Sequence, residues 1–222
     1  MELHKLGELS YYVHYPEGYE VGKRYPVIMY LHGAGTRYSH DTILNRNRFL
    51  AYYGTLDVEP FIGVLPLCEA DSWFSVFEHL RALVREVADA PYAERERLYL
   101  MGNSMGGYGT WQLAMSMPEY FAAIVPICGG GMYWQADTLK HVPVWAHHGA
   151  KDNVVRVEES QKMVDAVNAR GGNARLTIYP DLEHNSWDAT LSNPEVYRWL
   201  FSHKRHTTSS HPALTHQGEA YG

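Results

Sequence analysis

Residues 98–110 read LYLMGNSMGGYGT, and this stretch decides which fold the chain adopts. Its first four residues form an apolar run typical of a short buried strand, and residues 109–117 are typical of a helix that ends at the following proline. Gly102 and Gly106 flank Ser104, as a very tight strand-to-helix turn requires, because larger side chains there would collide. The pattern predicts that the Ser104 hydroxyl projects above a sheet edge, beside the N-terminal amides of a helix.

The rest of the chain alternates short apolar runs with longer amphipathic stretches, which indicates an α/β protein with a parallel sheet. Runs typical of strands lie at 9–15, 25–31, 61–67, 98–101, 124–127, 144–148 and 176–179. Stretches typical of helices lie at 77–87, 109–117, 155–167 and from Asn193-Pro194 onward. We expect residues 1–203 to form one catalytic domain and residues 204–222, which lack apolar periodicity, to form a flexible tail.

Composition excludes several classes of protein. The chain has 222 residues, of which 45% are hydrophobic and 20% charged, as in ordinary globular proteins. Its 19 Lys and Arg against 25 Asp and Glu give a net charge of −6, so we expect neither nucleic acid nor a membrane as a partner. The N-terminal residues carry no apolar signal segment, and we expect a cytoplasmic protein.

A serine hydroxyl needs a base to act as a nucleophile, and the base needs a carboxylate to orient it. His184 follows the last expected strand directly, where a loop can hold its ring over Ser104. Asp152 follows the strand at 144–148, and the chain order serine, acid, histidine is that of one triad lineage. We predict Ser104 as the nucleophile, His184 as the general base and Asp152 as the acid.

Other polar residues compete for these roles. His147 and His148 lie inside a strand, which favours packing roles, and His32 precedes a glycine-rich loop that it is expected to support through hydrogen bonds. Asp181 and Glu183 are rivals for the acid, although Asp181 is more typical of a turn residue in the loop of the predicted base.

The attacked carbonyl becomes an oxyanion that needs preorganised donors. We predict the amide of Met105, directly after the nucleophile, as one donor. The other is the amide of Ala34, because the small residues of Gly33-Ala34-Gly35 let the backbone approach a substrate closely. A turn that needs glycine only for its dihedral angles explains the same loop, so that alternative stays open.

Four blocks of sequence together resemble the α/β-hydrolase superfamily; they are HGAG at 32–35, GNSMGG at 102–107, HGAKD at 148–152 and HNSW at 184–187. The chain is most similar to small esterases such as dienelactone hydrolases, feruloyl esterases and polyhydroxyalkanoate-depolymerase-like esterases, and to the catalytic domains of prolyl oligopeptidases. The resemblance implies an α/β-hydrolase fold, with a mostly parallel eight-stranded sheet flanked by helices and the triad Ser104, Asp152 and His184. No segment is long enough for a helical lid domain, so we expect an open site.

The same resemblance bears on the two cysteines. In the strand order that the resemblance implies, Cys68 and Cys128 follow strands that are separated by two others, so the two residues are roughly 14 Å apart at about 4.8 Å per strand. A disulfide needs Cα atoms within about 7 Å of each other. We therefore predict two free thiols. No spacing of ligand residues indicates a metal site, and no cofactor is implied.

Aromatic residues follow several of the expected strands, where loops form the ligand crevice of an open α/β sheet. They are Tyr38, Trp73, Tyr133, Trp134 and Trp187. We expect about two or three of these rings to line a pocket that suits a phenyl, cinnamoyl or sugar group, and the others to cap the core.

These observations predict a serine carboxylesterase that hydrolyses small, aromatic or sugar carboxylic esters through an acyl-enzyme, with a small-molecule ester as its only implied partner. One alternative is a serine peptidase of the prolyl oligopeptidase type that uses the same residues. Another is a non-catalytic binding protein on the same scaffold, which needs the pocket but not the complete triad. Nothing in the sequence sets an oligomeric state.

Overall fold

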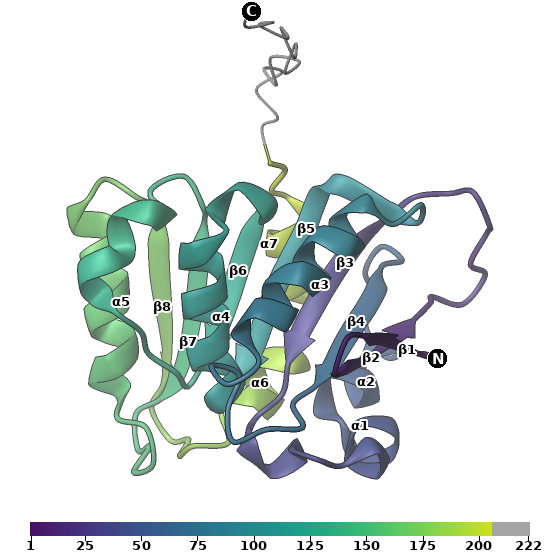
Figure 1. Ribbon diagram of the computed structural model, residues 1–222. Coiled ribbons are helices and arrows are strands. Elements are labelled where there is room, and N and C mark those ends of the chain that lie inside the picture. Colours follow the sequence, from purple (N-terminus) through teal and green to yellow (C-terminus); the bar gives the residue numbers. More distant parts are fainter. Residues whose placement is uncertain (206–222) are drawn as a thin grey trace, which may run out of the picture.

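The computed structural model describes residues 1–205, which contain a sheet of eight strands in the order β1-β2-β4-β3-β5-β6-β7-β8 (Figure 1). The strands are β1 (Glu2–Leu6), β2 (Leu9–His14), β3 (Tyr25–Leu31), β4 (Ile62–Leu67), β5 (Ala93–Asn103), β6 (Ala123–Ile127), β7 (Val144–Gly149) and β8 (Ala174–Tyr179). β1 and β2 pair antiparallel, as do β2 and β4, and the remaining pairs are parallel. The expected eight-stranded, mostly parallel sheet is confirmed.

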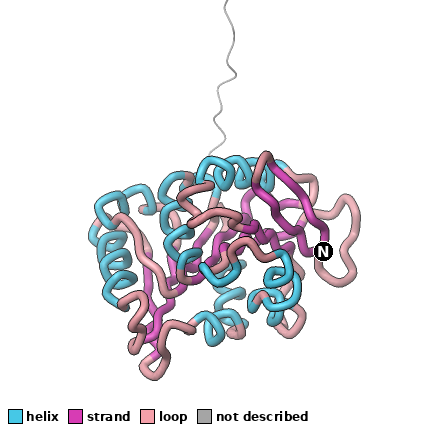
Figure 2. Tube along the Cα trace, turned by 60° about the horizontal axis from the view of Figure 1, so that its bottom comes forward, coloured by secondary structure: helices cyan, strands magenta, loops and turns pink. Residues whose placement is uncertain are grey.

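Helices cover both faces of the sheet, as Figure 2 shows from its lower edge. The α-helices are α1 (His40–Arg46), α2 (Arg48–Tyr53), α3 (Phe77–Asp89), α4 (Met105–Ser116), α5 (Val157–Ala169), α6 (Trp187–Leu191) and α7 (Pro194–Phe201). α3, α4 and α5 contribute buried residues to one apolar layer, and α1, α2, α6 and α7 contribute to the other. Short 3₁₀ turns lie at η1 (Ala34–Thr36), η2 (Pro118–Tyr120) and η3 (Tyr133–Leu139).

The central strand β3 explains why its sequence is apolar throughout. Val27 and Met29 point into the layer beneath α3 and α4, whereas Ile28 and Tyr30 point into the opposite layer. A parallel strand with helices on both faces has no solvent side, so its residues do not alternate with polar ones. The apolar sequence of β3 therefore continues up to His32, which lies at the carboxyl edge of the sheet, where the predicted site residues come together.

Most of the elements expected from periodicity are present. α5 ends before Gly171, whose φ of +78° suits glycine, and α7 begins at Pro194 with the Asn193 side chain accepting a hydrogen bond from the amide of Glu195. The apolar pattern did not indicate β1, α1 or α2, because β1 is largely exposed and each of the two short helices buries a single side chain. The tail predicted for 204–222 lies almost wholly outside the described residues.

The two cysteines are free, as predicted from the strand order. Cys68 follows β4 and Cys128 follows β6, and β3 and β5 lie between these strands. Among residues 1–205, the helices are all too short or too polar to cross a bilayer.

Two buried histidines make the stability of the fold depend on pH. Burial lowers the pKa of His147 to about 3 and that of His32 to about 4. An unfolded histidine takes up a proton near pH 6.5, so below that pH the unfolded chain binds more protons than the folded chain. The free energy of unfolding therefore falls as the pH drops from about 6.5 toward about 4.

We expect His147→Phe to weaken this pH dependence while keeping a ring stacked beside Tyr179. The substitution removes one proton from the uptake on unfolding, which corresponds to about 1.4 kcal/mol per pH unit between roughly pH 6 and 4. Urea unfolding at several pH values measures the free energy for both proteins. If the free energy of unfolding depended on pH in the same way in both proteins, His147 would have the same pKa in the folded and the unfolded chain, contrary to this prediction.

Candidate active site

Ser104 occupies the strained turn between β5 and α4, with φ 55° and ψ −118°. A non-glycine residue in such a conformation costs about 1–3 kcal/mol, and close packing on either side of the turn imposes it. A Cβ atom on Gly106 would lie 1.9 Å from the carbonyl oxygen of Leu31, and one on Gly102 would lie 2.4 Å from that of Gly106. Both flanking glycines are thus required by backbone contact.

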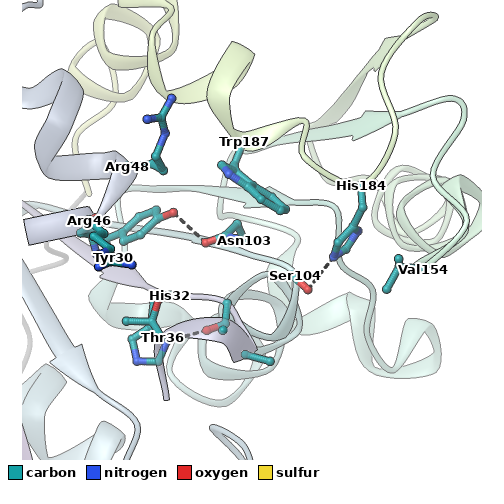
Figure 3. A pocket seen from close by; sticks show the side chains of 14 residues that line it. Tyr30, His32, Thr36, Arg46, Arg48, Asn103, Ser104, Val154, His184 and Trp187 are labelled. Atoms are coloured by element: carbon teal, nitrogen blue, oxygen red, sulfur yellow. Dashed lines mark hydrogen bonds between the residues drawn. The ribbon is translucent and has the colours of Figure 1, made fainter. Parts of the chain in front are cut away.

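The structure brings Ser104, His184 and Asp152 together at the carboxyl edge of the sheet, from loops after β5, β8 and β7. Figure 3 shows Ser104 and His184 with the hydrogen bond between them. His184 Nε2 lies 2.8 Å from Ser104 Oγ, and its Nδ1 lies 2.7 Å from Asp152 Oδ2. A carboxylate accepts, so Nδ1 donates and Nε2 is left to accept the serine proton. This is the arrangement that a general base needs.

Asp152 is held as a carboxylate inside the protein. Its side chain is fully buried, and Oδ1 accepts hydrogen bonds of 2.9 Å from the amides of Val154 and Val155. Burial by itself raises the pKa of Asp152, but the hydrogen bonds from His184 and from these two amides outweigh burial and lower it. Asp181, the rival acid, instead pairs with Lys151 on the surface.

The loop that follows β3 faces the serine. Ala34 lines the same cavity as Ser104, and Met105 is the first residue of α4, where backbone amides have no partner within the helix. His32 supports this loop, as expected, because its Nδ1 donates to the carbonyl of Gly33 (2.8 Å) and its Nε2 accepts from the amide of Cys68 (3.0 Å). Ala34 thus lies in the cavity that Ser104 lines, and Met105 follows Ser104 in the chain; the role of their amides as oxyanion donors stays a prediction.

A cavity of about 420 Å³ opens beside Ser104 and His184. Its other lining residues are Tyr30, His32, Gly33, Ala34, Gly35, Thr36, Arg46, Asn47, Arg48, Asn103, Val154 and Trp187. Trp187 stands edge-on to the His184 ring, with centroids 5.5 Å apart, and forms an aromatic wall (Figure 3). Across the cavity, Tyr30 donates a 2.7 Å hydrogen bond to Asn103 Oδ1.

Of the five candidate aromatic residues, about two or three of which are expected to line the pocket, only Trp187 lines this cavity. The prediction for Trp73 is wrong: its ring is fully buried in the core, and its Nε1 donates to the carbonyl of His32. Tyr38, Tyr133 and Trp134 are at least half exposed and lie outside the cavity lining. The position of an aromatic residue just after a strand is too coarse a criterion for predicting a substrate-binding residue, because it does not determine the direction of the side chain.

Sequence reasoning missed the wall that α1 and α2 provide. Arg46 and Arg48 reach the cavity from the junction of these helices, and Arg48 pairs with Asp188 of α6 at 2.5 Å. The sequence did contain a signal for the starts of α1 and α2, because Ser39 and Asn47 are residue types that cap helices. In the structure their side chains accept hydrogen bonds from amides of the first turn.

A model of the Dienelactone hydrolase family matches residues 68–193, a range that contains Ser104, Asp152 and His184. The chain belongs to the dienelactone hydrolase family. The resemblance drawn from the sequence motifs is thereby confirmed, and the family supports an esterase-like hydrolase.

Solved structures share the fold of this dienelactone hydrolase family member. A thermostable esterase superposes with a TM-score of 0.80 and 31% sequence identity, over 92% of this chain and 62% of that chain. A feruloyl esterase module from Clostridium thermocellum, complexed with sinapinate, gives a TM-score of 0.66 at 19% identity, over 95% of this chain and 90% of that one. At that identity the second likeness concerns the fold alone.

Dipeptidyl-peptidase 5 of Porphyromonas gingivalis is 22% identical over 244 residues, which cover 87% of this chain and 36% of the peptidase. The chain thus spans about a third of that curated relative. A hydrolase unit of this kind therefore also occurs as a part of larger proteins.

Cys128, Asp152 and His184 offer ligand atoms within 4.8 Å of one another. A thiol binds a metal as the thiolate, but burial raises the pKa of Cys128 to about 12. The carboxylate and the imidazole already share a hydrogen bond. The chemistry of these three side chains therefore fits a network of hydrogen bonds better than a metal site.

We expect Gly106→Ala to destabilise the protein by about 3 kcal/mol or more, because its methyl group overlaps the Leu31 carbonyl. Gly54→Ala is the matched control, since a Cβ there meets nothing within 4 Å and the backbone is already helical. Thermal unfolding of both variants measures the difference. Equal melting temperatures would contradict the close approach of α4 to β3.

Proposed function

We propose that this protein is a serine carboxylesterase. The observation that carries the proposal is the chain of hydrogen bonds from Ser104 through His184 to Asp152, which opens onto a solvent-accessible cavity. The helices between β3 and β4, α1 and α2, have only seven and six residues, and they contribute to the wall of the cavity. The site is therefore suited to dissolved small esters rather than to long-chain lipids at an interface.

The proposed reaction uses each group for one task. Ser104 Oγ attacks the ester carbonyl while its proton passes to His184 Nε2, and Asp152 stabilises the imidazolium that forms. The amides of Ala34 and Met105 hold the negative oxygen of the tetrahedral intermediate. His184 returns the proton to the departing alcohol, and a water molecule then releases the acid from Ser104 by the same steps in reverse.

Trp187 supports a substrate with a flat ring. Its ring is the aromatic surface of the cavity beside the base, and such a surface buries a large apolar area at little cost in conformational entropy. We therefore propose small aromatic or sugar carboxylic esters as the substrate class.

A peptidase is the second candidate, favoured by the likeness to dipeptidyl-peptidase 5. Amide hydrolysis needs the same triad and, in addition, a site that holds an amino terminus or an extended peptide. Comparing kcat/KM for a p-nitrophenyl ester and for the matching p-nitroanilide separates the two. The carboxylesterase proposal requires the ester to be strongly preferred.

Ser104→Ala should lower kcat for a p-nitrophenyl ester by about 10⁴-fold or more, because the remaining groups cannot form the acyl-enzyme. The same variant should lose labelling by a fluorophosphonate probe, and a circular dichroism spectrum checks that it is folded. A folded variant that keeps its activity would overturn the assignment of the nucleophile. Failure of the unaltered protein to react with the probe would favour a binding protein.

Trp187→Ala should raise KM for a feruloyl ester by roughly tenfold, while that for an acetyl ester changes less, because only the aromatic acyl group meets the ring. Trp134→Ala is the matched control: it removes the same side chain from an exposed position outside the cavity lining. Equal changes in the two variants would argue against an aromatic subsite at Trp187.

A further inference from the structure

The side chain of Arg37 turns back onto the loop that follows β3, where Ala34 and Gly35 line the cavity. Its Nε donates to the carbonyl oxygen of Ala34 at 3.0 Å, and its Nη1 donates to that of Asp71 at 2.7 Å. A guanidinium has only donors and is always protonated in proteins, so these contacts admit one assignment of the protons. Arg37 itself is not among the residues that line the cavity, so any effect on the site passes through the loop.

The turn that carries Ala34 is weakly held by its own backbone. η1 has three residues, and none of them is buried. The hydrogen bonds that close it are long, at 3.2 Å to the carbonyl oxygen of Gly33 and 3.3 Å to that of Ala34. Short 3₁₀ turns have poor hydrogen-bond geometry, and an exposed turn has little apolar contact to hold it. The bond from Arg37 Nε to the Ala34 carbonyl is charge-assisted, and such bonds are about twice as strong as neutral ones.

The segment 68–73, between β4 and α3, is the anchor for this loop. One end of the loop is fixed at His32, because the amide of Cys68 donates to His32 Nε2 and Trp73 Nε1 donates to the His32 carbonyl, both at 3.0 Å. The other end is fixed at Tyr38, whose amide donates to the carbonyl of Cys68 at 3.1 Å. Cys68 and Trp73 are fully buried. The ends of the loop are therefore held by the core of the protein.

Two side chains fix the peptide planes on either side of the Ala34 Cα atom. The amide of Ala34 shares a plane with the carbonyl of Gly33, which accepts a hydrogen bond from His32 Nδ1 at 2.8 Å. Arg37 holds the next plane through the carbonyl of Ala34 and connects it to Asp71. With both planes held, the direction of the Ala34 amide is fixed.

We propose that Arg37 is a positioning residue that directs the amide of Ala34 toward the oxyanion. The inference rests on the proposed function, because it requires a tetrahedral intermediate at Ser104. An oxyanion donor contributes to catalysis by being oriented before the reaction, so a loop that can turn away loses part of that contribution. The loss falls on kcat, because the neutral carbonyl of the bound ester interacts with the donor more weakly than the oxyanion does.

Arg37→Met keeps an unbranched side chain but removes the donors to both carbonyls. For a p-nitrophenyl ester we expect kcat to fall by roughly tenfold, with KM within about twofold of that of the unaltered protein. Arg37→Lys keeps the positive charge but has a methylene group in the place of Nε, so it should lose a similar factor. Full activity in Arg37→Lys, or an unchanged kcat in Arg37→Met, would overturn the positioning role.

A trifluoromethyl ketone inhibitor provides a readout that a general loss of packing does not produce. Ser104 Oγ adds to the ketone carbonyl, the serine proton passes to His184, and the ketone oxygen becomes an oxyanion. The inhibition constant should therefore rise in Arg37→Met by about the factor by which kcat/KM falls. Equal inhibition of Arg37→Met and the unaltered protein would overturn the proposal. An unaltered protein that hydrolyses no ester and is not inhibited would instead refute the proposed function.

Arg198→Met is the matched control. Arg198 also donates to a loop carbonyl, that of Asp57 at 3.1 Å, and pairs with Glu195, but it does not line the cavity. Thermal unfolding checks that each variant is folded at the assay temperature. We expect kcat and the inhibition constant to stay unchanged in the control, and a loss as large as in Arg37→Met would overturn the proposal.

Discussion

The contact between the first turn of α4 and the end of β3 is the constraint on which the site depends. Gly106 lies so close to the Leu31 carbonyl that no side chain fits between them. This packing holds the helix over the sheet edge and forces the chain to turn sharply at Ser104, which adopts a positive φ as a result. The hydroxyl therefore projects from rigid backbone rather than from a flexible loop, and its strain is balanced by the burial of α4.

A second constraint is the buried charge of Asp152. Its carboxylate receives the amides of Val154 and Val155 on one oxygen and two histidine rings on the other. These donors come from the loop after β7, from the strand itself and from the loop after β8. A carboxylate in the interior is stable only when its lone pairs are used in this way, so the same atoms that order the loops also orient the proposed base.

The cavity combines these parts with walls that short helices contribute. The proposed triad and the loop after β3 lie at the sheet edge, whereas α1, α2 and Trp187 of α6 form walls from separate short helices. The thermostable esterase and the much longer dipeptidyl-peptidase 5 resemble the same chain. Such a division lets substrate preference change in the walls while the edge of the sheet stays constant.

The sequence by itself determined most of the sheet, the tight turn at Ser104 and the chain order of the proposed triad residues, because each depends on local pattern: apolar runs, paired glycines and polar residues just beyond a strand. It also indicated that His32 supports a loop. The tertiary structure alone decided that Trp73 is buried while Trp187 lines the cavity, since the direction of a side chain after a strand depends on what packs against it. It likewise decided that His148, which the sequence placed among packing residues, contacts Asp152, because the pairing of hydrogen-bond donors and acceptors exists only once β7, α5 and their loops are assembled.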